Sequence, residues 1–148
     1  MKRSSKFKSV QRYSKLKEHN ASRELGKINQ LLEQNRNRLA DLRNYQEDYG
    51  QQFIQQGYKG VSAGQVRDYH RFMENLKKAI EQQTRVISQI EVQFEVARRQ
   101  WLAARGKSKA IETVVNQHLT REQLQEDKRD QREIDDREAV KISYKNNK

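Results

Sequence analysis

The chain has 148 residues, of which 33% are hydrophobic and 34% are charged, and it contains no cysteine and no proline. An ordinary globular domain is about 45–50% apolar, so this chain has too few apolar side chains for a many-layered core. The missing cysteines exclude disulfides, thiol catalysis and zinc sites built on cysteine. The sequence has no run of about 18 apolar residues that could cross a membrane. We therefore expect a soluble, cytoplasmic, helical protein.

The first predicted element is a helix over about residues 5–56, and it starts with a strongly basic stretch. The formal net charge of the chain is +11, and residues 1–17 contain seven basic and no acidic side chains. Such an end can bind nucleic acid, an anionic membrane or an acidic protein surface, or it can be a solvated helix start. Phe7, Val10, Tyr13 and Leu16 recur every three residues, which indicates an amphipathic helix.

The rest of this helix carries a heptad repeat, in which positions a and d are apolar and face a partner helix. Before Ala21 we expect the register to slip, because Tyr13 and Leu16 do not fit the frame. Position a is occupied by Leu25, Leu32, Leu39, Gln46 and Phe53, and position d by Ala21, Ile28, Asn35, Leu42 and Tyr49.

A glycine-rich segment, about residues 57–63, predicts the one clear break between helices. Gly57 and Gly60 lie in it, and Gly64 follows directly. Gly57 can end the first helix, and Ser62 can cap the next.

The second predicted helix covers about residues 64–138 and repeats the heptad pattern. Position a is occupied by Val66, Met73, Ile80, Ile87, Phe94, Trp101, Ser108 and Val115. Position d is occupied by Tyr69, Leu76, Gln83, Ile90, Ala97, Ala104, Ile111 and His118.

Folding the chain at the glycine segment brings the two heptad frames into one antiparallel register. Leu32 then faces Ile87, and the two polar d residues, Asn35 and Gln83, face each other. A buried polar pair costs stability but fixes register. The predicted fold is therefore all-α: a single hairpin of two long helices in an antiparallel coiled coil, with the second helix overhanging. The unpaired extension is expected from about residue 119.

One flank of the predicted pair carries extra apolar side chains at position g. Tyr45 faces Phe72 there, and Leu31 faces Val86. A slightly rotated core could absorb these residues, or they could form a groove that binds a partner.

The sequence lacks the usual residues of an active site. The histidines at positions 19, 70 and 118 are too far apart to suggest a metal site, and no paired carboxylates lie in an apolar setting. The glycine segment also lacks the ending of a phosphate loop. We predict no enzymatic activity, no cofactor and no metal.

Two segments carry aromatic and apolar residues in a rather specific order and spacing. The stretch LADLRNYQEDY at residues 39–49 is similar to the L-x-x-Y-x-x-E/D-Y pattern of the flagellar FliJ family of export proteins. The stretch YHRFMENLKKAIEQ at residues 69–82 is similar to its Y-x-x-F-x-x-x-L-x-x-A-I-E-Q pattern. Trp101 and the EDKR sequence at residues 126–129 also fit, so the likeness covers about residues 20–135.

This resemblance implies a soluble adaptor of the flagellar type III export apparatus. Family members form a stalk-like coiled coil that binds the hexameric export ATPase, links it to the membrane export gate and escorts export chaperones. The implied location is the cytoplasm, peripheral to the inner membrane at the export apparatus, with no direct membrane span and no nucleic-acid partner.

The resemblance also implies site residues, although the heptad places four of them, at positions 42, 49, 76 and 83, in the partly buried d frame. The gate-binding face corresponds to Phe72, Leu76, Ala79 and Gln83, and the adjacent partner surface to Leu42, Tyr45 and Tyr49. By the stalk analogy, the basic end with Lys6, Lys8, Arg12 and Lys15 would face the ATPase ring.

Two other functions remain open at this point. A basic coiled coil could associate with nucleic acid, although the positive charge clusters at one end and forms no long stripe. The chain could also be a generic spacer, for which the apolar g flank would be unnecessary.

Overall fold

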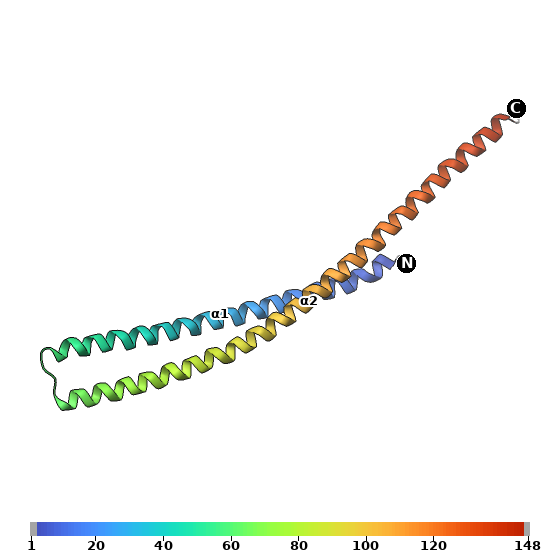
Figure 1. The fold of residues 1–148 in the computed structure, drawn as a ribbon. Helices are drawn as coiled ribbons and strands as arrows, with labels where there is room; N and C mark the ends of the chain where they lie inside the picture. The colour runs from blue at the N-terminus through green and yellow to red at the C-terminus, as the bar shows by residue number, and fades with distance from the viewer. Residues whose placement is uncertain (1–2, 147–148) are drawn as a thin grey trace. The chain divides into compact units, whose positions relative to one another are not determined.

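The structure, a computed structural model, describes residues 3–146. It consists of two helices, α1 (Arg3–Gly57) and α2 (Ala63–Asn146), and the described part of the chain contains no strand. In Figure 1, α1 runs towards the turn and α2 runs back from it alongside α1, so the two helices of the hairpin are antiparallel. The predicted all-α antiparallel hairpin is confirmed.

The packing of the helices divides the chain into two compact units. The hairpin unit contains residues 20–101, and the terminal unit contains residues 1–19 with 102–148. Each unit pairs a piece of α1 with a piece of α2.

The core of the hairpin unit lies where the heptad frames predicted it. Leu32, Ile87 and Ile90 are buried together, and Ile28, Leu39, Val86 and Phe94 pack against them. Burying an aliphatic side chain of this size contributes about 1.5–3 kcal/mol. Because the apolar seam is narrow, these few residues supply much of the stability of the unit.

A polar layer interrupts this core at Asn35 and Gln83, as predicted. The Gln83 Nε2 group donates to the Asn35 side-chain oxygen and to the Asn35 backbone oxygen, at 3.0 Å in each case. The Asn35 Nδ2 group donates in turn to the Leu31 backbone oxygen at 2.8 Å. The buried amides therefore have partners, and their pairing fixes the register of the two helices.

We expect the polar layer to act as a unit in stability measurements. Asn35→Leu alone should lower the free energy of unfolding by about 0.5–1.5 kcal/mol, because the Gln83 amide loses its side-chain acceptor and keeps only the backbone oxygen of residue 35. The double variant Asn35→Leu, Gln83→Leu should recover most of that loss, since neither polar group is then left buried. Urea unfolding of the single and double variants measures both effects. A double variant as unstable as the sum of the two singles would contradict this account.

The turn uses glycine and a capping box. Gly60 has a φ of 91°, a conformation that favours glycine because it has no Cβ. At the start of α2 the Gln65 backbone N–H donates to Ser62 Oγ at 3.1 Å, and the Ser62 N–H donates to Gln65 Oε1 at 2.8 Å. The predicted cap at Ser62 is thus confirmed, with Gln65 as its reciprocal partner.

In the terminal unit, the heptad frame of α1 continues without the predicted slip. Ser14 is buried, and Gln11 and Glu18 are half-buried on the same face. Tyr13 and Leu16 remain 58% and 56% exposed. The prediction of a slip was wrong because an uninterrupted helix keeps its contact face in register, even where that face carries polar side chains. An apolar residue at every third position is therefore a weaker guide than the frame that continues from Ala21.

The helix α2 continues to Asn146, beyond the predicted end near residue 138. Local side-chain pairs support α2 over residues 123–135, because Gln123 Nε2 donates to Asp127 Oδ1 and Gln131 Nε2 donates to Asp135 Oδ1. Such i,i+4 pairs stabilise a solvated helix. Residues 127–146 are all exposed, whereas Phe7 and His118 still stack at 5.1 Å between ring centroids.

Candidate functional site

An aromatic ladder runs along the hairpin unit next to the turn. The Phe53 and Tyr69 rings stack at 3.8 Å, and Tyr69 stacks on Tyr49 at 5.8 Å. Tyr49 lies 4.3 Å from Phe72, which in turn lies 6.0 Å from Tyr45. The ladder therefore connects the core positions a and d to the g flank, and it ends on Tyr45.

The predicted site residues near this ladder differ in how far their side chains are exposed. Tyr45 is 57% exposed, whereas Phe72 and Ala79 are half-buried on the same flank. Leu76 is only 8% exposed. The flank thus offers Tyr45 and the outer edges of Phe72 and Ala79 to a partner.

The remaining predicted residues belong to the seam between the helices. Leu42 and Tyr49 are half-buried. The Gln83 side chain is held by its hydrogen bonds to Asn35, so its amide is committed inside the hairpin. Leu76, Tyr49 and Gln83 are therefore placed to position their neighbours more than to contact a partner.

A shallow groove of about 320 Å³ lies beside Tyr45. It includes Arg38 and Asp41, which the sequence analysis missed. Their positions could have revealed them, because they lie four residues before Leu42 and Tyr45 and so share a face with them. The lining residues are Arg38, Asp41, Leu42, Tyr45 and Gln83.

Part of the g flank packs against the core and part of it stays exposed, so both arrangements that the sequence allowed are present. Val86 packs against the core, while Leu31 stays 41% exposed and Tyr45 stays outside. The core has therefore absorbed part of the flank, and the apolar surface that remains is concentrated near Tyr45.

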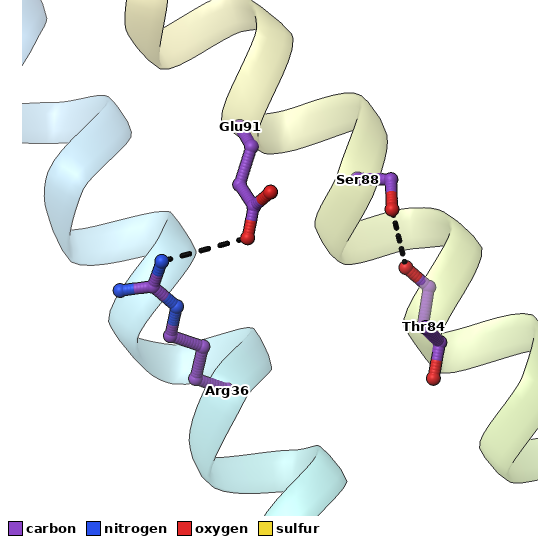
Figure 2. A network of polar contacts seen from close by, with 4 residues as sticks. All are labelled: Arg36, Thr84, Ser88 and Glu91. Carbon is purple, nitrogen blue, oxygen red and sulfur yellow. Dashed lines mark hydrogen bonds and ion pairs between the residues drawn. The ribbon is translucent and has the colours of Figure 1, made fainter.

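The other flank of the pair, at heptad position e, is polar. Figure 2 shows the Arg36 side chain of α1 directed towards Glu91 of α2. The distance between Arg36 Nη2 and Glu91 Oε1 is 3.5 Å. On α2 itself, the Ser88 hydroxyl donates to the Thr84 backbone oxygen. The Arg36 and Glu91 side chains are 60% and 52% exposed, so this ion pair contributes little stability.

In the terminal unit, the predicted basic end is fully accessible. Lys6, Lys8, Arg12 and Lys15 are all exposed. Lys17 lies with its Nζ 4.8 Å from the centre of the Tyr13 ring. Among the described residues, no group of three His, Cys, Asp or Glu side chains is placed to hold a metal ion.

Comparison with known proteins identifies the family. The family model described as "Flagellar FliJ protein" matches residues 2–147. The chain belongs to the flagellar FliJ family. Two curated relatives, each named "Flagellar FliJ protein", come from Salmonella typhi and Escherichia coli (strain K12). Each is 25% identical over 116 residues, which covers 78% of this chain and 79% of the relative. No solved structure gives a significant match.

Membership of the FliJ family implies a component of the flagellar export apparatus. FliJ proteins are not a known family of enzymes. Within residues 3–146, neither helix of this chain has a stretch long and apolar enough to span a membrane.

Proposed function

We propose that this chain is an adaptor that joins the hexameric export ATPase to the membrane export gate. The observation that carries the proposal is the family match over residues 2–147. The exposed Tyr45 beside Phe72 and the basic start of α1 provide separate surfaces for two partners. The adaptor would work in the cytoplasm, peripheral to the inner membrane. Escort of export chaperones is proposed from the family resemblance alone.

The gate would bind the flank formed by Tyr45, Phe72 and Ala79. Aromatic anchors surrounded by less important contacts usually dominate the binding energy of an interface. Leu76 and Gln83 would support this surface from inside, because Leu76 is buried and Gln83 is tied to Asn35.

The ATPase would meet the basic end of α1. Residues 5–17 carry five cations and no carboxylate, so they attract an acidic surface from a distance. At about 0.1 M salt the Debye length is about 10 Å, so the attraction should weaken as salt rises.

Neutralising four cations tests this assignment. The variant Lys6→Gln, Lys8→Gln, Arg12→Gln, Lys15→Gln should bind the purified ATPase with an association rate about tenfold lower at low salt, because electrostatic steering raises such rates by at least that factor. Its affinity for the cytoplasmic part of the gate protein should stay within about twofold. Surface-plasmon resonance with full-length chain measures both.

A matched control removes the same charge from the hairpin unit. Arg23, Lys27, Lys59 and Arg67 are exposed, and replacing all four by Gln should leave ATPase association nearly unchanged. Equal slowing by the two variants would mean that overall charge, and not the basic end, drives the encounter.

A further inference from the structure

A second groove lies in the terminal unit, between the start of α1 and the facing part of α2. Its volume is about 270 Å³, which corresponds to about nine waters at about 30 Å³ each. That is room for one or two aliphatic side chains. The lining residues are Val10, Tyr13, Ser14, Lys17, Ala104, Lys107 and Ile111.

This groove occupies the same heptad positions as the groove beside Tyr45. The α1 residues of each groove lie at positions g, c, d and g, and the two sets are four heptads apart. The corresponding residues are Val10 and Arg38, Tyr13 and Asp41, Ser14 and Leu42, and Lys17 and Tyr45.

The chemistry of the terminal groove is distinct. Its floor is formed by Ser14, which is 4% exposed, while Val10 and Tyr13 remain 45% and 58% exposed. Lys17 and Lys107 are part of the wall, and no acidic side chain belongs to the described lining. An occupant must therefore bring apolar surface to cover Val10 and Tyr13, and negative charge to face the lysines.

We propose that this groove binds an amphipathic segment of the export ATPase. An apolar side chain of that segment enters the groove, and carboxylates of the segment flank this side chain. This inference rests on the proposed function in taking the ATPase as the partner. The contact at the basic end is then specific in shape as well as in charge: the apolar side chain covers Val10 and Tyr13, and the carboxylates pair with Lys17 and Lys107.

The test compares polar substitutions inside and outside the groove. Val10→Ser with Tyr13→Ser should weaken the affinity for the purified ATPase hexamer about tenfold, with little change in its salt dependence. Leu16→Ser is the matched control, because Leu16 is 56% exposed on the same helix but does not line the groove. It should change affinity by less than about twofold. Circular dichroism should show unchanged helicity for both variants.

Two further experiments test the role of the two lysines and identify the segment that the groove binds. Lys17→Gln with Lys107→Gln should weaken binding and flatten its dependence on salt. A photoreactive phenylalanine analogue at position 13 should cross-link to an ATPase peptide that contains an aliphatic residue next to Asp or Glu. The same analogue at position 16 should cross-link far less.

The outcomes separate this inference from the proposed function. If the Val10 and Tyr13 variant binds the ATPase like the wild type while the four-cation variant binds slowly, the contact is by charge alone and the groove proposal is overturned. Cross-linking from position 13 to a second copy of this chain also overturns it. If the wild-type chain fails to bind the ATPase, both proposals fall.

Discussion

Phe72→Asp is expected to reduce the affinity of the full-length chain for the cytoplasmic part of the export gate by about one hundredfold, and to abolish swimming. Losing an aromatic anchor commonly costs about 2–4 kcal/mol of binding free energy, and each 1.4 kcal/mol is about a factor of ten. The Phe72 ring lies 4.3 Å from the Tyr49 ring, so the variant also loses packing inside the hairpin unit. Isothermal titration calorimetry gives the affinity, and soft-agar spreading gives the motility.

Two further variants separate binding from folding. Tyr45→Asp changes a side chain that is 57% exposed, so it should leave thermal stability nearly unchanged and still weaken gate binding about tenfold or more. Tyr58→Asp adds the same charge in the turn, where Tyr58 is 88% exposed, and should have no effect on binding. Normal gate binding by the Tyr45 variant would place the gate contact elsewhere.

Ile87→Asp is expected to have the largest effect on stability. Ile87 is 7% exposed and lies in the core with Leu32 and Ile90, where a carboxylate would lose most of its contact with water. Burying such a charge, together with losing the aliphatic contact, should cost about 4 kcal/mol or more. For a chain of this size that corresponds to a melting temperature lower by about 10 °C or more.

Thermal unfolding followed by circular dichroism measures this effect. Gln89→Asp is the matched control, since Gln89 is exposed two residues away and receives the same charge. A melting temperature within about 2 °C of wild type for the Ile87 variant would show that the seam does not hold the two helices together.

The sequence predicted the hairpin unit well because its frame is marked by large apolar side chains. Leu32, Ile87 and Ile90 occupy a and d without ambiguity, and the facing amides of Asn35 and Gln83 could occur together in only one register. The family could also be recognised, because its two aromatic segments lie in the right order and at the right spacing. Contacts with partners could not be derived in this way, since neither heptads nor burial identify what covers an exposed side chain.

The terminal unit was harder to predict because its contact face is polar. Ser14 and Ser108 are 4% and 3% exposed, yet serine gives no hydrophobic signal in a sequence. Small side chains can be buried simply because the backbones come close, whereas Tyr13 lies at position c, outside the seam, and stays 58% exposed. The groove beside Tyr13 could not be derived from the heptad and required the structure.

The Asn35–Gln83 layer has a mechanical consequence. Sliding α1 past α2 by one heptad would place Asn35 opposite Leu76 or Ile90, and both amides would lose the hydrogen bonds that they now share. Each buried polar group left without a partner costs about 1–3 kcal/mol, so the shifted registers lie well above the native one. A pull along one helix of the hairpin unit is therefore passed to the other helix instead of being released by slippage, and the unit behaves as a stiff link under shear.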